Sequence, residues 1–413
     1  MSKSLLPVAN IPLFWYSLNM LSRNNIKDVI LVTNERCHSE IKNLLNDHSF
    51  PSIPNLSIEV ICIDSKIDED ADEWGTADVL RHIQPKLKKD RDLLIVSGDV
   101  VSDISLTKML SFHCKNNSMV TCLLSDSIIN GPVPGPKERL KKYRDFVALI
   151  PDTNQLLFLS EEEDFGEAQE FNGNLFKKYP KVSFTSKYKD IHIYVMKQSA
   201  VEILKSHKNF SSIKADLISY LLRTQYSNKS GPELLNSLPN AACKCFAYVC
   251  STEDDASLIA RCNNVAVYFE TNRAVQKILN KLHPGNVQKS REDLKSSSVN
   301  AIESQISVSG KIGEKTIFKK SVIGDNCSIG SGVKIESSLL MNDVVVKDGA
   351  VIKNSILFPN VEVGEKADLG MCIVSTGQTI GNKEKIVNQI VSPEKEMAID
   401  ENDFAPQILP MLL

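Results

Sequence analysis

The sequence predicts an α/β domain with a mostly parallel sheet, followed by a parallel β-helix. Three observations carry this prediction: tandem 17-residue repeats in the last third of the chain, alternating strand-like and helix-like segments before them, and a short polar stretch between the two. We expect the α/β domain over residues 1–283, a linker over 284–303, the β-helix over 304–390 and a tail over 391–413.

The repeats align without gaps, in five copies that begin at residues 304, 321, 338, 355 and 372. Each copy has an apolar residue in three columns. The first column holds Ile306, Ile323, Leu340, Leu357 and Val374, the second Ile312, Ile329, Val346, Val363 and Ile380, and the third Phe318, Ile335, Ile352, Leu369 and Ile386. The columns lie six, six and five residues apart, a spacing that fits neither a helix nor a flat strand. It predicts a triangular coil with one inward side chain per side, stacked through parallel strand pairing.

Glycine follows the second column in four copies, at Gly313, Gly330, Gly364 and Gly381. We expect a corner with positive φ at these positions, because glycine adopts that conformation readily. Unrelated β-hairpins are the alternative, and five ungapped copies argue against them. Such coils also occur in acyltransferases that use a histidine as general base, but none of the seven histidines falls within the repeats. We therefore interpret the coil as a packing and assembly surface.

The first two-thirds of the chain alternates short apolar runs with helical patterns. The strand-like runs are residues 28–33, 56–63, 92–97, 120–124, 146–150 and 191–196, and the helix-like segments are 13–23, 40–48, 77–87 and 106–113. This alternation predicts a layered α/β domain. Ligands bind such sheets at the carboxyl ends of the strands, so residues that directly follow a strand are the candidates for a site.

Two short motifs are candidates. Gly98 and Asp99 follow an apolar strand, where an aspartate can hold a divalent cation that bridges nucleotide phosphates. A loop aspartate that caps a turn is the plainer alternative. Gly75, Thr76 and Ala77 precede a helix, where glycine lets a planar base approach the backbone and Thr76 suits an N-cap. An ordinary helix start explains the same three residues.

Composition excludes several classes of protein. Hydrophobic residues make up 42% and charged residues 24%, with a net charge of -3 and a pI near 6.2. This balance favours neither direct nucleic-acid binding nor a membrane partner. The start of the chain shows no signal-peptide pattern and the ten cysteines are scattered, so we expect a cytoplasmic (cytosolic) protein with reduced thiols. Cys243, Cys245, Cys250 and Cys262 lack the paired spacing of a zinc site, and we predict no metal and no cofactor.

The segment Lys3-Ser-Leu-Leu-Pro-Val8 resembles the end of the signature of the sugar-nucleotide pyrophosphorylases, in which an α/β domain precedes a coil of hexapeptide repeats. The glycine motif at 75–77 is similar to their base-recognition turn, and the motif at 98–99 to their first metal aspartate. The resemblance implies a nucleotidyltransferase-like domain and a left-handed β-helix of hexapeptide type. It also implies a vestigial nucleotide site at Lys3, Gly75, Thr76, Ala77, Gly98 and Asp99.

Departures from that family argue against catalysis. The glycine-rich loop that cradles phosphates would precede Lys3, so we expect an N-terminally incomplete α/β domain. Ser160–Asp164 stands where the family has a second active-site lysine, and Asp190–His192 replaces the asparagine-alanine-glycine segment under the sugar. The second metal aspartate has no counterpart around Val249–Asp254. Because phosphoryl transfer depends on these groups for positioning and charge, we expect no catalytic residues.

Further segments resemble the gamma-subunit family of eukaryotic translation initiation factor 2B, the guanine-nucleotide exchange factor for initiation factor 2. They are Leu5–Val8 with Pro12–Tyr16, Gly75–Arg81 with Gln84–Leu87, Asp190–Tyr194, Glu270–Val275, and Ser321–Gly324 with Leu339–Asn342. The resemblance implies a non-catalytic subunit that supports GDP/GTP exchange on initiation factor 2 by assembling with the epsilon and other subunits. Because the sequence ends soon after its last repeat, we expect a gamma-type subunit and not one with the C-terminal helical domain of the epsilon family. A sugar-nucleotide pyrophosphorylase, or its regulatory subunit, is the alternative.

Overall fold

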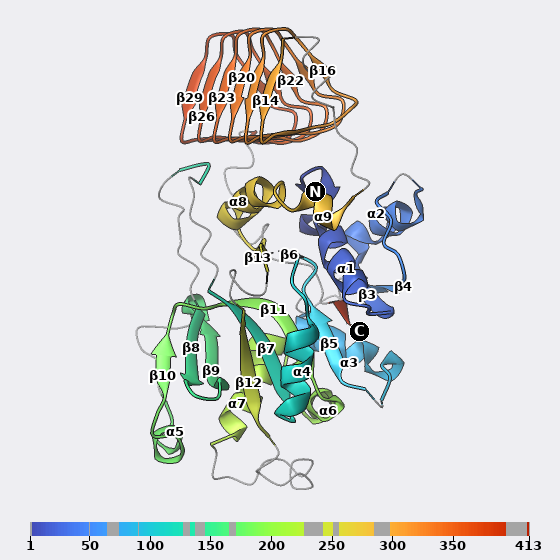
Figure 1. The fold of residues 1–413 in the computed structure, drawn as a ribbon, viewed down its shortest axis with the longest axis vertical. Coiled ribbons are helices and arrows are strands. Elements are labelled where there is room, and N and C mark those ends of the chain that lie inside the picture. The colour runs from blue at the N-terminus through green and yellow to red at the C-terminus, as the bar shows by residue number, and fades with distance from the viewer. Residues whose placement is uncertain are drawn as a thin grey trace.

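The computed structural model of the chain describes residues 2–48, 50–63, 74–89, 91–126, 133–136, 145–164, 171–226, 243–250, 256–284, 298–393 and 411–412. These residues form an α/β domain beneath a parallel β-helix (Figure 1). No helix among the described residues is long and apolar enough to cross a membrane.

A ten-stranded sheet is the centre of the α/β domain, with the strand order β10-β8-β9-β12-β7-β11-β5-β31-β3-β4. In that order the strands are Ser183–Thr185, Asp145–Ile150, Gln155–Glu161, Cys245–Cys250, Val120–Ser125, Lys189–Met196, Leu93–Val96, Met411–Leu412, Asp28–Asn34 and Ser57–Ile63. Strands β3, β4, β5, β7 and β12 run in one direction, and β11 and β31 run against their neighbours. The predicted parallel core of the sheet is therefore present, with antiparallel strands added to it.

Helices cover both faces of this sheet. On one face α3 (Thr76–Ile83), α6 (Gln198–Ser206), the π-helix η5 (Ile213–Ile218) and α7 (Ser219–Thr224) pack on one apolar core. On the other face α1 (Leu13–Arg23), α2 (Glu35–Asn46) and α4 (Thr107–Lys115) pack on a second core. Helix α2 begins five residues before the predicted segment, because the Asn34 side chain caps it by accepting a hydrogen bond from the Cys37 N–H.

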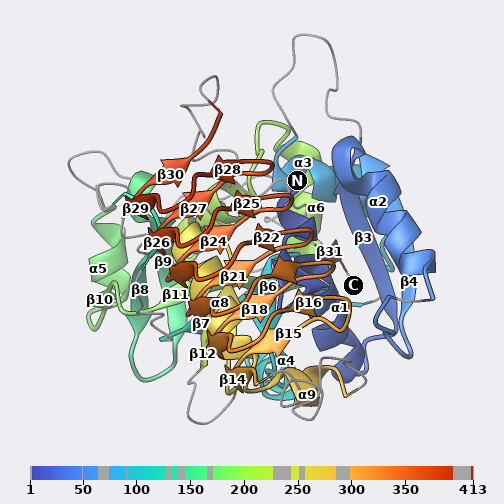
Figure 2. The same ribbon diagram turned by 90° about the horizontal axis from the view of Figure 1, so that it is seen from above.

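The β-helix consists of three parallel sheets that its coils build together (Figure 2). One sheet contains β14 (Asn300–Ile302), β17 (Ile317–Lys319), β20 (Lys334–Glu336), β23 (Val351–Lys353), β26 (Asp368–Gly370) and β29 (Lys385–Val387). The second contains β15 (Gln305–Ile306), β18 (Val322–Ile323), β21 (Leu339–Leu340), β24 (Ile356–Leu357), β27 (Ile373–Val374) and β30 (Ile390–Val391). The third contains β16 (Lys311–Ile312), β19 (Ser328–Ile329), β22 (Val345–Val346), β25 (Glu362–Val363) and β28 (Thr379–Ile380). Strand β14 lies within the predicted linker, one 17-residue repeat before β17.

The three predicted columns line the interior of this coil. All their members belong to one apolar core, and Ile312 is the one column residue that is only partly buried. The prediction of positive φ at the four glycines after the second column was wrong, because positive φ among the described glycines occurs at Gly135, Gly332, Gly349 and Gly377 instead. Three of these glycines, Gly313, Gly330 and Gly364, allow neighbouring coils to stack closely, whereas a Cβ on Gly381 would meet only the Glu384 side chain of its own coil. A Cβ on Gly313, for example, would lie 2.6 Å from the backbone carbon of Gly330 in the next coil.

The β-helix rests on the α/β domain through one of its three sheets. Val322, Leu339 and Ile356 point outward from that sheet into an apolar core. The core also contains the N-terminal segment with the hairpin β1 (Pro7–Val8) and β2 (Ile11–Pro12), and helices α8 (Val265–Val275) and α9 (Leu279–Leu282). Hydrogen bonds of 2.8 Å add to the contact between the two parts, from Asn10 Nδ2 to the Ile323 carbonyl, from Gln305 Nε2 to the Ala9 carbonyl and from the Gly135 N–H to the Met371 carbonyl.

Candidate functional site

Asp99 lies in the turn after β5, at the carboxyl end of a central strand. The turn, which also contains the buried Gly98, is held by α1, whose Ser17 hydroxyl donates to the Ser97 carbonyl at 3.0 Å. The Asp99 carboxylate is fully buried. It accepts hydrogen bonds from the Ser97 hydroxyl at 2.6 Å and from the Lys3 ammonium at 2.7 Å. The structure thus brings two predicted site residues, Lys3 and Asp99, into direct contact.

A second cation approaches the same carboxylate. Strand β13 (Ile259–Arg261) pairs with β6 (Val100–Ser102), and this pairing brings the Arg261 Nε to 3.6 Å from Asp99 Oδ2. Burial by itself raises the pKa of Asp99, but the charges of Lys3 and Arg261 outweigh it and lower the pKa to about 2. Asp99 is therefore ionised and already neutralised from within the chain. Across the described residues, no group of three or more His, Cys, Asp or Glu side chains is arranged to hold a metal ion.

His192 is the next residue of this buried group. Strand β11 has an irregularity against β7 here, and His192 has a φ of 55°, in the left-handed region that residues other than glycine rarely adopt. Its Nε2 lies 2.7 Å from Nη1 of Arg261. Burial, and then the charges of Arg261 and Lys214, lower the pKa of His192 well below its usual range, so the ring is neutral. A bulky imidazole thus lies where the resemblance to the pyrophosphorylases expects a glycine. We call Lys3, Ser97, Asp99, His192 and Arg261 the Asp99 cluster.

A second buried ionic group adjoins the Asp99 cluster. The Nζ of Lys214, on η5, lies 2.7 Å from carboxylate oxygens of both Asp145 and Glu161 and 3.6 Å from Asp190 Oδ2. Burial alone lowers the pKa of Lys214, but the three carboxylates outweigh it and raise the pKa above its usual value. His192 Nε2 lies 3.9 Å from Glu161 Oε1 and joins the two groups. A glutamate, within the predicted segment 160–164, thus lies where the resemblance expects a lysine.

The third predicted part, the turn Gly75–Ala77 at the start of α3, is covered by the segment before η5. The Ala77 N–H donates to the Ser211 carbonyl at 2.7 Å, and Thr76 Oγ1 accepts a hydrogen bond from the Ile213 N–H at 2.8 Å. A Cβ on Gly75 would overlap Ser211. The chain itself therefore packs on the surface where the resemblance expects a base. None of the hydrogen bonds and ion pairs found among the described residues joins this turn to the Asp99 cluster.

Sequence reasoning missed Arg261, Lys214 and Asp145. The one signal for Arg261 is its position in an apolar stretch, Leu258-Ile-Ala-Arg-Cys262, since a charge in such a stretch is expected to be buried and paired. Lys214 and Asp145 belong to no motif, and their partners lie far away in the sequence. The segment Val249–Asp254, where the resemblance would place a second metal aspartate, lies mostly outside the described residues, and its described part is Val249 and Cys250 at the end of β12.

Two family models match the chain in the order in which the structure places its two parts. Residues 1–128 match the nucleotidyl transferase family. Residues 286–386 match the left-handed β-helix (LbH) domain of the eIF2B epsilon subunit. The fold is therefore a nucleotidyltransferase-like domain followed by a left-handed parallel β-helix, as predicted.

Curated relatives extend this similarity over most of the chain. The chain is 34% identical over 328 residues to translation initiation factor eIF2B subunit gamma of Caenorhabditis elegans, covering 78% of this chain and 75% of the relative. It is 25% identical over 375 residues to the gamma subunit of Dictyostelium discoideum, covering 79% and 82%. The epsilon subunit of Dictyostelium discoideum is 24% identical over 220 residues, covering 53% of this chain and 30% of that relative.

Proposed function

The chain belongs to the family of gamma subunits of translation initiation factor eIF2B, and on that premise we propose that it supports guanine-nucleotide exchange on initiation factor 2 as a non-catalytic partner of the epsilon subunit. In this proposal the chain works in the cytosol, within the assembled complex. It contributes contact surfaces, and it binds neither nucleic acid nor a membrane directly. Exchange would be promoted because the complex binds initiation factor 2 in a state that holds nucleotide poorly.

The enclosed Asp99 is the observation that carries the non-catalytic part of the proposal. A nucleotidyltransferase needs such a carboxylate free to bind a metal ion that bridges phosphates. Here Lys3 and Arg261 face the carboxylate, and it has no exposed surface. Replacing these cations with a hydrated metal ion would require the turn after β5 to open. This arrangement supports a structural role for Asp99 and the two cations that face it.

The β-helix supports the assembly part of the proposal. One of its three sheets is covered by the α/β domain, and the other two face away from it. Apolar side chains stand out from these two sheets, with Ile317 exposed by 40%, Val345 by 38% and Val387 by 45%. Stacked solenoids often assemble through their flat outer faces, and these side chains would supply apolar contacts on such faces. We propose that other eIF2B subunits bind there.

Affinity purification of the tagged full chain from cytosol, followed by mass spectrometry, tests the assignment to a complex. We expect the epsilon subunit in near-equal amount together with the other eIF2B subunits. A double variant, Val345→Asp with Val387→Asp, tests the surface. It places charges on the two outer sheets of the β-helix and should reduce the recovery of the other subunits. Isolation of the chain alone, or with an active pyrophosphorylase, would contradict the proposal.

A reconstitution experiment tests the non-catalytic part separately. GDP release from initiation factor 2 is measured with eIF2B assembled with and without this chain, and with the chain alone. We expect faster release when the chain is present in the complex and no release by the chain alone. The chain alone is also incubated with Mg²⁺, nucleoside triphosphates and sugar phosphates, and formation of pyrophosphate there would favour the pyrophosphorylase alternative.

A further inference from the structure

Four phenylalanine rings gather at one end of the ten-stranded sheet. The ring centroid of Phe171 lies 5.0 Å from those of Phe158 and Phe184, and the ring centroid of Phe176 lies 6.2 Å from that of Phe184. Phe158 and Phe171 pack on a small apolar core, but Phe176 is exposed by 50% and Phe184 by 47%. We call these four residues the phenylalanine patch. Because its exposed rings touch and are not scattered singly, the patch is a candidate contact surface.

The phenylalanine patch lies beside an open edge of the sheet. Strand β10 is the end strand and pairs with β8 on one side, and no described strand pairs with its other side. Phe184 is the middle residue of β10, and Phe176 belongs to the neighbouring helix α5 (Asn174–Lys178). Figure 1 shows β10 and α5 at the end of the α/β domain that lies away from the β-helix. An end strand presents unpaired N–H and C=O groups, to which an extended peptide can bond.

The charges around the phenylalanine patch are positive. Residues 171–189 contain no aspartate or glutamate and five lysines, which are Lys177, Lys178, Lys181, Lys187 and Lys189. Lys177 and Lys181 are exposed, and neither forms an ion pair within the part of the chain that the structure describes. The carboxylate nearest to Lys187 is that of Asp126, 3.8 Å away. The patch therefore combines exposed aromatic rings with cations that lack counter-charges.

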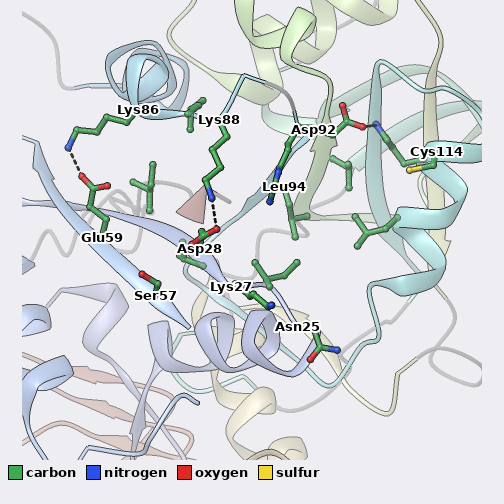
Figure 3. A pocket seen from close by; sticks show the side chains of 18 residues that line it. Asn25, Lys27, Asp28, Ser57, Glu59, Lys86, Lys88, Asp92, Leu94 and Cys114 are labelled. Carbon is green, nitrogen blue, oxygen red and sulfur yellow. Dashed lines mark hydrogen bonds and ion pairs between the residues drawn. The ribbon is translucent and has the colours of Figure 1, made fainter. Parts of the chain in front are cut away.

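Lysines elsewhere on the α/β domain have closer carboxylate partners. A cavity of about 650 Å³ beside β3 and β4 shows the contrast (Figure 3). Among the side chains that line it, the Lys86 ammonium lies 2.6 Å from Glu59, and the Lys88 ammonium lies 2.6 Å from Asp28. The lysines of the cavity are thus paired within the chain, whereas those beside the phenylalanine patch would attract carboxylates from a partner.

We propose that β10 and the phenylalanine patch bind an extended acidic segment of another protein. The segment adds a strand beyond β10, places an apolar side chain against Phe176 and Phe184, and brings its carboxylates near Lys177 and Lys181. This contact lies on the α/β domain, apart from the outer sheets of the β-helix, and so goes beyond the proposed function. It would exist whether or not those sheets bind other subunits.

Two other occupants fit the same surface less well. A second copy of the chain would pair β10 with β10 and bring the lysines of both copies together, which repel each other. Single-stranded RNA would need open ring faces on which successive bases stack. Phe171 meets Phe176 at 68° and Phe184 at 74°, so the rings pack edge to face and form no row of parallel platforms. The open strand edge also offers backbone groups that suit a peptide.

Binding of two labelled synthetic peptides to the full chain tests the proposal. One peptide alternates glutamate with valine and phenylalanine, and the other has lysine in place of each glutamate. Fluorescence anisotropy should show binding of the acidic peptide, weakened by salt, and none of the basic peptide. Lys177→Glu with Lys181→Glu should weaken the acidic peptide about tenfold or more and allow the basic peptide to bind. Phe176→Ser with Phe184→Ser should cause a similar loss, about tenfold. Lys334→Glu, at an exposed position on the β-helix, is the control and should change nothing.

Hydrogen–deuterium exchange locates the bound peptide. The acidic peptide should slow exchange in β10 and leave the β-helix unchanged. The same peptide with N-methyl groups along its backbone keeps its charges but cannot pair as a strand, and it should not protect β10. Absence of binding, protection elsewhere, or binding that the lysine and phenylalanine variants do not weaken would overturn the proposal.

Two further measurements address the other occupants. A labelled oligouridylate that binds more tightly than the acidic peptide, and that Phe176→Ser with Phe184→Ser releases, would assign the patch to RNA. A dimer in analytical ultracentrifugation that the same double variant abolishes would assign it to a second copy. Either result would overturn the proposal. We expect weak binding of the oligouridylate that is insensitive to this double variant, and no dimer that depends on it.

Discussion

At the scale of single residues, the buried charges of the Asp99 cluster stabilise the fold only while each has its partner. Asp99→Asn leaves Lys3 and Arg261 buried without their counter-charge, and removing one partner of a buried pair costs about 3–5 kcal/mol. We expect the free energy of unfolding of the α/β domain to fall by about that amount in denaturant titrations. Glu59→Gln is the control, because its pair with Lys86 is half-exposed and contributes little. Equal stability of the two variants would show that Asp99 has no structural role.

The contribution of Asp99 to the free energy of unfolding depends on pH, because its pKa differs between the folded and unfolded chain. The pKa of Asp99 is lowered from 3.8 to about 2 in the folded chain, a change worth about 2 kcal/mol. A depressed pKa stabilises the fold above the unfolded-state value, and this contribution is lost as pH falls from about 4 to about 2. The difference in unfolding free energy between the unchanged chain and Asp99→Asn should therefore narrow across this window. A constant difference would mean that Asp99 does not titrate there.

At the scale of elements, the close stacking of coils in the β-helix requires glycine at positions such as Gly364. A Cβ on Gly364 would lie 2.7 Å from the Asn382 nitrogen of the next coil, while one on Gly370 would meet nothing closer than 3.7 Å. Gly364→Ala forces backbone apart in a packed coil and should destabilise the β-helix by about 1–3 kcal/mol. Gly370→Ala is the matched control and should unfold at the same temperature as the unchanged chain. Calorimetry distinguishes the two variants.

The features that the sequence predicts are those encoded by residues close together in the chain, and contacts between distant residues are not predicted. The columns from Ile306 to Ile386 were predictable because a 17-residue period fixes which side chains point inward. The same period carries no information on the distance between coils. The prediction of positive φ at the glycines after the second column was therefore wrong, because close stacking of coils is what requires glycine there. The pair Lys3–Asp99 joins residues 96 positions apart, and Asp145–Lys214 joins residues 69 apart. Neither pair leaves a pattern in the local sequence, and neither does the pairing of β31 within the sheet. The motifs therefore identified Lys3 and Asp99 but not the residues that pair with them from distant parts of the chain.

At the scale of the whole molecule, the β-helix and the α/β domain are joined through one sheet of the coil. Leu339 points out of the coil into this contact, so its replacement does not disturb the interior column that includes Leu340. Leu339→Asp would bury a carboxylate among apolar side chains without a partner, which costs several kcal/mol. We therefore expect the two parts to separate while each stays folded.

Small-angle X-ray scattering and limited proteolysis measure that separation. Leu339→Asp should increase the radius of gyration and speed cleavage between the two parts, while circular dichroism keeps the strand signal. Val345→Asp provides the control, since Val345 points outward from a sheet that the α/β domain does not cover and is exposed by 38%. It should leave the scattering of the isolated chain unchanged. If both variants scatter alike, the apolar contact around Leu339 does not hold the molecule together. The hydrogen bonds of Asn10, Gln305 and Gly135 to the other part of the chain would then be candidates for holding it together.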